Sequence, residues 1–200
     1  MVIKTYPLGS LQANCYIVID EETNKAVAID PGAQASYLMK EIENLGVDID
    51  LILLTHCHFD HNGAVKELKE KFNCKVYINK AEEEYMEIDS TGIYGNLPKF
   101  YEYVTEGEII NSGNLNFKVI FTPGHTKGGT CYLINDSIFT GDTLFNGSIG
   151  RTDFLGGSYN DLIEGIENKL MVLDNNITIY PGHGPKSTIG YEKCRNPFLA

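Results

Sequence analysis

The chain has 200 residues and a formal net charge of −11, from 16 lysines and arginines against 27 aspartates and glutamates. This length can bury a sizeable core, and we expect residues 1–200 to form a single domain. The few basic residues are not clustered, which argues against a nucleic-acid partner.

The N-terminus and the cysteines both indicate that the protein stays in the reducing cytoplasm. The first 20 residues lack the basic start, long apolar core and cleavage site of a signal peptide. No apolar run approaches the ~20 residues that span a membrane. The five cysteines form no Cys-x-x-Cys pair, and an odd, dispersed set is typical of reduced thiols. We therefore expect a cytoplasmic protein without a membrane partner, and the oligomeric state stays open.

The first part of the sequence alternates predicted strands and helices. Short runs of apolar and β-branched residues predict strands, and apolar residues at helical spacing, closed by Gly46, predict the first helix. The run LILL (51–54) suits a strand that is buried on both faces. The expected strands are 1–7, 14–20, 25–30, 51–54 and 75–79, the expected helices are 35–45, 64–72 and 81–88, and 55–63 is expected to be a loop.

The second part repeats this order after an irregular segment at 89–104. Its expected strands are 115–123, 129–135, 137–142 and 176–182, and its expected helix is 159–172. Strands followed by strand–helix alternation in each part predict an α/β sandwich with helices outside two sheets.

All five histidines lie directly after a predicted strand or in the loop that follows it. Three of them stand in the segment HCHFDH (56–61), and the other two end the similar segments TPGH (122–125) and YPGH (180–183). Asp142 also stands at a predicted strand end. A lone histidine is usually structural, but five at strand ends are typical of a metal site, because neutral imidazole is the commonest transition-metal ligand.

The spacing within 56–61 also indicates more than one ion. Side chains two residues apart in an extended segment face the same way, so His56 and His58 are expected to reach one ion. Asp60 and His61 lie past the bend and are expected to reach another. Scattered structural histidines remain the alternative interpretation, which the clustering disfavours.

The pattern His-x-His-x-Asp-His after an apolar strand, with a later Gly-His, Gly-Asp and Gly-His, resembles the metallo-β-lactamase-fold superfamily along nearly the whole chain. The resemblance implies a four-layer αββα sandwich of two mixed sheets with helices on the outside. It implies two zinc ions, with iron and manganese as the other candidates. The implied ligands are His56, His58 and His125 for the first ion, Asp60, His61 and His183 for the second, and Asp142 as the bridge.

Within that family, Asp142 and the segment GDTLFNGSIGRTDF (141–154) are similar to short glyoxalase II-like hydrolases. The Gly-Arg-Thr-Asp stretch within this segment (150–153) is also similar to persulfide dioxygenases. The better-known glutathione-thioester hydrolases carry a further helical region with basic residues that hold glutathione. We expect no such C-terminal helical domain here, and the family's substrate lysine is matched in position by Arg151.

The expected function is hydrolysis of a small-molecule acyl or thioester substrate, similar to a hydroxyacylglutathione, by a hydroxide that bridges two metal ions. Two cations lower the pKa of water from 15.7 to about 7. A thiolate leaving group, with a pKa of about 8.5, needs little help from a general acid. Two alternatives stay open: a persulfide dioxygenase with one iron held by His58, His125 and Asp142, and a metal-binding regulatory protein without catalysis.

Two polar residues of this site each have two interpretations. Asp60 is expected to be a catalytic residue that orients the hydroxide, or a ligand only. Arg151 is expected to bind a carboxylate of the substrate, or to form an ion pair with Asp153 that fixes its loop.

Several neighbouring residues are candidates for supporting roles. Tyr94, Tyr101 and Tyr103 either line the substrate entrance or pack half-buried, and packing is the favoured interpretation. Asn14 and Thr55 are expected to support the ligands.

Overall fold

The first half of the chain forms a six-stranded mixed sheet in the computed structural model, which describes residues 1–199. The strand order is β1-β2-β3-β4-β5-β6, with the first three antiparallel and the pairs from β3 to β6 parallel. Its strands are β1 Val2–Leu8, β2 Ala13–Ile19, β3 Lys25–Ile29, β4 Asp48–Leu53, β5 Lys75–Asn79 and β6 Glu102–Val104.

The second half forms another six-stranded sheet, in the order β14-β13-β10-β9-β8-β7. Only β10 and β13 are parallel. Its strands are β7 Ile109–Ser112, β8 Leu115–Phe121, β9 Thr130–Ile134, β10 Ser137–Gly141, β13 Thr178–Pro181 and β14 Ser187–Thr188. A small hairpin of β11 Leu144–Phe145 and β12 Ser148–Ile149 stands beside this sheet.

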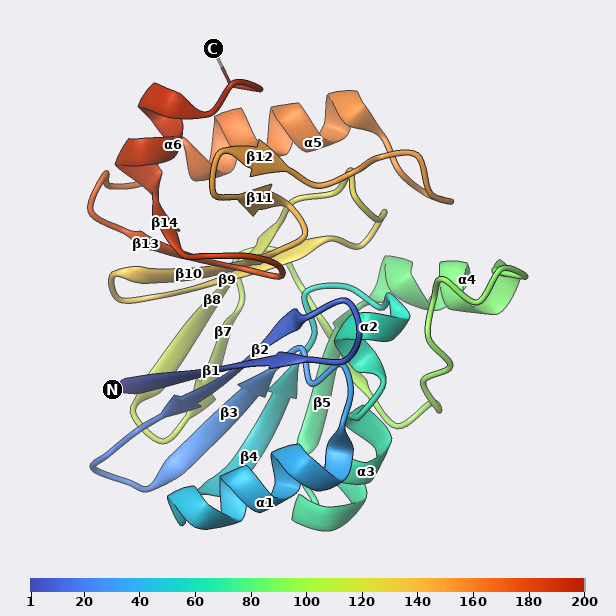
Figure 1. Cartoon of the computed structure of the whole chain (residues 1–200), viewed down its shortest axis with the longest axis vertical. Coiled ribbons are helices and arrows are strands. Elements are labelled where there is room, and N and C mark those ends of the chain that lie inside the picture. Colours follow the sequence, from blue (N-terminus) through green and yellow to red (C-terminus); the bar gives the residue numbers. More distant parts are fainter. Residues whose placement is uncertain (200) are drawn as a thin grey trace.

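Helices cover the outer face of each sheet, as Figure 1 shows. The first sheet carries α1 Ala35–Leu45 and α3 Val65–Phe72, and the second carries α5 Tyr159–Gly165, the π-helix η1 Ile166–Leu170 and α6 Ile189–Arg195. The short α2 Phe59–Asn62 and α4 Lys80–Ile88 lie beside the first sheet. The predicted four-layer αββα sandwich is therefore confirmed.

The core between the sheets explains why the central strands have no polar face. In β2, Cys15 and Ile17 pack in the cluster under the outer helices, while Tyr16 and Val18 pack in the cluster between the sheets. Because side chains alternate along a strand, a strand covered on both faces is apolar throughout. The fully buried Phe117 of β8 belongs to the same inter-sheet cluster.

The predicted elements are confirmed in most places and wrong in a few. The helix predicted at 35–45 has these bounds in the structure, but the predicted loop 55–63 contains α2, and the helix predicted at 159–172 ends as the π-helix η1. The segment 89–104, expected to be irregular, ends in the three-residue edge strand β6. The strands β7, β11, β12 and β14 and the helix α6 were not predicted. The added strands are two to four residues long and form by pairing, so local sequence carries little signal for them.

The remaining general expectations concern cysteines and membranes. All five cysteines are free thiols, and Cys57 is buried in the core, as are Cys15 and Cys131. No helix within residues 1–199 has the length and apolar character to cross a bilayer.

We expect Phe117→Ala to lower the free energy of unfolding by about 3–5 kcal/mol, because it leaves a cavity between the sheets. Urea denaturation of the metal-loaded protein measures this loss. The control is Ile109→Ala on β7, whose side chain is 49% exposed and which should change stability by less than about 0.5 kcal/mol. Equal losses in the two variants would contradict the inter-sheet core described above.

Candidate metal centre

Seven side chains from distant parts of the sequence meet at one edge of the two sheets. The segment 56–61 follows β4, Asp142 follows β10 and His183 follows β13, while His125 lies in the loop between β8 and β9. The carboxyl ends of β4, β10 and β13 therefore point toward the same place. All five histidines and both aspartates that the sequence singled out are brought together there.

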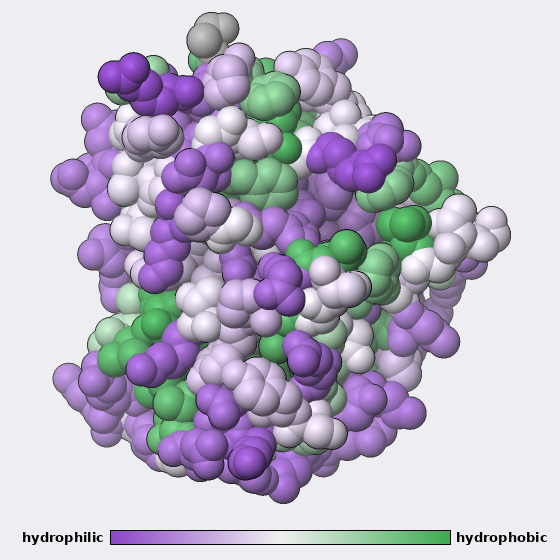
Figure 2. Space-filling view, in the orientation of Figure 1, coloured by the Kyte–Doolittle hydropathy of each residue, from purple (hydrophilic) through white to green (hydrophobic). Residues whose placement is uncertain are grey.

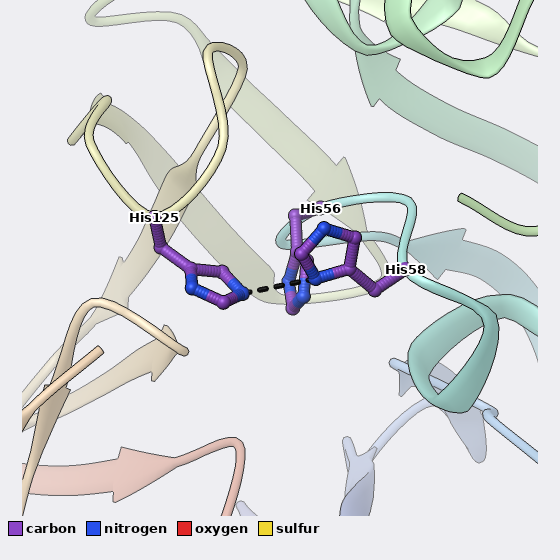
Figure 3. A group of neighbouring side chains, drawn as sticks. All are labelled: His56, His58 and His125. Atoms are coloured by element: carbon purple, nitrogen blue, oxygen red, sulfur yellow. Dashed lines mark hydrogen bonds between the residues drawn. The ribbon is translucent and has the colours of Figure 1, made fainter. Parts of the chain in front are cut away.

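The first group consists of His56, His58 and His125, which Figure 3 shows with their rings turned toward one another. Nε2 of His125 lies 3.0 Å from Nδ1 of His58. Two nitrogens bound to one tetrahedral ion at ~2.05 Å would lie about 3.3 Å apart. All three histidines are at least 96% buried, and their ring centroids lie between 4.7 and 4.9 Å apart. This group has the geometry of a three-nitrogen metal site.

The second group consists of Asp60, His61 and His183. Oδ2 of Asp60 lies 3.2 Å from Nε2 of His183 and 3.6 Å from Nε2 of His61. Asp142 lies between the two groups. Its Oδ1 is 3.4 Å from Nε2 of His61, and its Oδ2 is 3.6 Å from Nε2 of His125. The Asp142 carboxylate can therefore contact an ion in either group.

Backbone carbonyls fix which nitrogen of two histidines carries the proton. Nδ1 of His125 lies 2.7 Å from the carbonyl oxygen of Arg151, and Nδ1 of His183 lies 3.2 Å from that of Leu11. A carbonyl oxygen only accepts hydrogen bonds, so each Nδ1 must donate. Nε2 of both histidines, when neutral, is then a lone pair that faces the centre.

Asp30 fixes the rings of His61 and His56 in the same way. Its Oδ2 accepts from Nδ1 of His61 at 3.0 Å and from the Thr55 hydroxyl at 2.6 Å. Because the Thr55 hydroxyl uses its one hydrogen on Asp30, it accepts from Nδ1 of His56 at 3.1 Å. Four of the five histidines therefore present Nε2 to the centre.

Two of these nitrogens and one carboxylate oxygen are left without a hydrogen-bond partner. Within residues 1–199, Nε2 of His56, Nε2 of His61 and Oδ1 of Asp142 are buried atoms without a hydrogen-bond partner. An unpaired buried acceptor costs about 1–3 kcal/mol, so such a cluster needs a cation in contact with it. The residues present fit two metal ions with nitrogen and oxygen ligands.

The two groups differ in the charge that they favour. Burial lowers the pKa of His56 well below its usual value, and burial with the neighbouring histidines lowers the pKa of His58 to about 3. Burial also opposes the charge of His61, but the carboxylates of Asp142 and Asp30 outweigh it and raise its pKa to about 9. The first group is thus held as neutral imidazoles, and the second attracts positive charge.

Sequence reasoning missed two buried carboxylates that hold the ligand segments. Asp30 follows a predicted strand in the run AVAIDPG, and an acid directly before a Pro-Gly break was a signal that could have found it. Glu82 gave no signal, because it lies in the acid-rich helix α4. Its fully buried carboxylate accepts from the backbone N–H of Cys57 at 2.7 Å and of Gly128 at 2.8 Å. Glu82 therefore joins the two loops that carry the first group.

The expected supporting residues lie where the sequence suggested. The side-chain amide of Asn14 donates to the carbonyl oxygens of Pro181 and Gly184, on either side of His183, both at 3.0 Å. Thr55 contacts Asp30 and His56 as described above.

Tyr94 and Tyr101 follow the packing interpretation, whereas Tyr103 is exposed. Tyr94 is buried with its ring 4.8 Å from that of His58, and the hydroxyls of Tyr101 and Tyr103 donate to Glu83. None of them lines the pocket over the centre.

A pocket of about 480 Å³ opens over the two groups. Figure 2 shows hydrophobic residues in green gathered on this face, between α2 and the loop that follows β12. Arg151 contributes the basic side chain of the lining. The apolar lining residues are Leu11, Phe59, Ile93, Phe145, Ile149 and Phe154.

Known proteins are similar to this chain in sequence and architecture. The model of the metallo-beta-lactamase superfamily matches residues 8–183. The hydroxyacylglutathione hydrolase GloC of Haemophilus influenzae is 38% identical, over 100% of this chain and 98% of its own.

Solved structures also superpose closely on this chain. The BLEG-1 B3 metallo-beta-lactamase has a TM-score of 0.92 at 35% identity, with 99% of both chains covered. TTHA1623 in a di-iron-bound form has a TM-score of 0.88 at 33% identity, with 100% of both chains covered. ETHE1 from Myxococcus xanthus has a TM-score of 0.86 at 29% identity, covering 98% of this chain and 84% of its own.

We expect Asp30→Asn to weaken metal binding about 10- to 100-fold, because an amide cannot accept all the hydrogen bonds that orient Thr55 and His61. Competition with a chromophoric chelator measures the affinity. The control is Asp20→Asn, which changes another buried carboxylate that accepts several hydrogen bonds, in the turn after β2. If Asp30→Asn binds metal as tightly as the unmodified protein, Asp30 does not orient the ligands.

Proposed function

Because this chain belongs to the metallo-beta-lactamase superfamily, we propose that it is a metal-dependent hydrolase that cleaves thioesters. Three observations support this proposal: the ligand geometry, the chemistry of the pocket, and the similarity to GloC over nearly the full length of both chains. The substrate is a small acyl compound that enters the pocket over the two groups.

The ligand assignment follows the two groups. His56, His58 and His125 would hold one ion, Asp60, His61 and His183 a second, and Asp142 would contact both. The donor set has no sulfur, which suits zinc and also accepts iron or manganese. When bound, such a pair of ions supplies a water of strongly lowered pKa as the nucleophile and a Lewis acid for the carbonyl oxygen of the substrate.

Asp60 is the residue that we propose to orient the attacking water. Its Oδ2 lies 3.2 Å from Nε2 of His183 and 3.6 Å from Nε2 of His61, so positive charge held between these groups keeps the carboxylate ionised. A carboxylate that stays ionised accepts a hydrogen bond from water and fixes the direction of its lone pair. Asp60 lines the pocket, so it can contact both the water and the reacting carbonyl group.

The observation that carries the choice of a thioester is the lack of a proton donor for the leaving group. No lysine, tyrosine or cysteine side chain of residues 1–199 lines the pocket, and the histidines of the lining belong to the ligand groups. An amine leaving group needs a proton from such a donor, whereas a thiolate with a pKa of about 8.5 leaves without one.

A second candidate function is a persulfide dioxygenase with one iron, held by His58, His125 and Asp142. The similarity to ETHE1 from Myxococcus xanthus favours it. The set of seven converging side chains favours two ions instead, because a single ion in the first group would leave His61 and Asp60 without a function.

The two candidates are separated by metal analysis of protein purified without added metal, combined with two assays. Two ions per chain together with thioester turnover support the hydrolase. One iron per chain together with oxygen consumption on glutathione persulfide supports the dioxygenase. Metal-loaded protein that is inert toward both substrates would overturn both candidates and favour a regulatory metal-binding protein.

We expect Asp142→Ala to lose one or both ions and at least about 100-fold of the thioester activity, because the carboxylate between the two groups is removed. Elemental analysis and initial rates measure the two effects. Asp136→Ala is the matched control, since Asp136 is an exposed acid at the other end of β10. An Asp142→Ala protein with two ions and full activity would refute the bridging role.

A further inference from the structure

We infer that the substrate of this pocket is a thioester with an apolar acyl group on a thiol that carries no net negative charge. This inference rests on the proposed hydrolase function and names the substrate class of the same site. It departs from what similarity to a hydroxyacylglutathione hydrolase would suggest, because glutathione is an anionic thiol with two carboxylates.

The walls of the pocket carry the first part of the inference. Leu11 and Phe59 at its edge keep 52% and 44% of their surface exposed, and Phe145 and Ile149 add apolar surface from the β11–β12 hairpin. Exposed apolar side chains gathered around a pocket usually mark the place where an apolar ligand binds. The acyl group is therefore the part of the substrate that these walls would cover.

The state of Arg151 carries the second part. Its Nε and Nη2 donate to the two carboxylate oxygens of Asp153, both at 2.6 Å, and its guanidinium carbon lies 3.9 Å from the ring centroid of Phe154. The charge of Arg151 is thus already matched by a carboxylate in a two-pronged pair. Because Asp153 already occupies Nε and Nη2, a substrate carboxylate gains less from Arg151 than it would from an unpaired arginine.

No lysine and no other arginine of residues 1–199 lines the pocket. Asp60 and Asp142 also line it, but as the proposed metal ligands their charge would be taken up by the ions. The chain as a whole carries a net charge of −11, which also disfavours the approach of anions. Recognition of a carboxylate or a phosphate normally uses an unpaired arginine or lysine. Glutathione and phosphate-bearing thiols such as coenzyme A therefore lack a partner here, while a neutral thiol needs none.

The experiment compares thioesters of one acyl group, butanoyl, on two thiols: glutathione and the neutral N-acetylcysteamine. We expect kcat/KM of the metal-loaded protein to be at least about tenfold higher for the neutral thioester. Acetyl and butanoyl thioesters of N-acetylcysteamine form a second comparison. In this comparison we expect kcat/KM to rise about fourfold for each added methylene that the pocket walls cover. Equal or higher kcat/KM for the glutathione thioester would overturn the inference.

Asp153→Asn tests the role of the ion pair. Asp153 does not line the pocket, and the substitution frees the guanidinium of Arg151 for a substrate carboxylate. We expect kcat/KM for the glutathione thioester to rise up to about fivefold and that for the neutral thioester to stay unchanged. Asp48→Asn is the control, because it removes the same charge from an ion pair with Lys25 at the far end of β4. No rise in Asp153→Asn, or an equal rise in Asp48→Asn, would contradict the pairing argument.

A binding measurement separates this inference from the proposed function. Calorimetry with the hydrolysis-resistant thioethers S-butyl-glutathione and S-butyl-N-acetylcysteamine reports the preference of the pocket without turnover. Tighter binding of the neutral thioether, in a protein that hydrolyses no thioester, would leave the pocket inference standing and the hydrolase function refuted. Tighter binding of the glutathione thioether would refute the pocket inference whatever the protein hydrolyses.

Discussion

A group of buried lone pairs without hydrogen-bond donors is the constraint on which the rest of the structure depends. Nε2 of His56 and His61 and Oδ1 of Asp142 are buried without a hydrogen-bond partner, and Nε2 of His61 lies 3.4 Å from Oδ1 of Asp142. Folding removes water from these atoms, and a bound cation would compensate them together. The buried carboxylates of Asp30 and Glu82 then serve to keep the rings and loops in positions that no local hydrogen bond would maintain.

The sandwich places these groups at the junction of its two halves. Each sheet contains parallel strands whose carboxyl ends meet at one edge, and the ligands follow β4 in the first sheet and β10 and β13 in the second. Neither half alone carries a complete group of three ligands with the bridging Asp142. The apolar cluster between the sheets therefore fixes the ligand geometry as well as the stability, since it sets how the two halves lie relative to each other.

The centre and the pocket walls have different tasks. One arrangement of metal-binding side chains can support unlike reactions, because function depends on the residues placed around it. Selectivity must come from the residues around the centre. In this chain these are apolar side chains and an arginine whose charge Asp153 already balances. The same reaction centre can thus serve a substrate class that differs from that of a similar enzyme.

The sequence by itself determined the sandwich, the helix at 35–45 and the seven side chains at strand ends, because alternation, helical spacing and a dense histidine motif are local signals. The tertiary structure alone decided the short edge strand β6, the helix α2 within the 56–61 segment, and the roles of Asp30 and Glu82. These features come from partners far away in the chain: Asp30 meets a ring 31 residues on, and Glu82 meets a loop 46 residues on. A local pattern cannot encode such a contact, since the distance between the partners is fixed only once the sheets have packed.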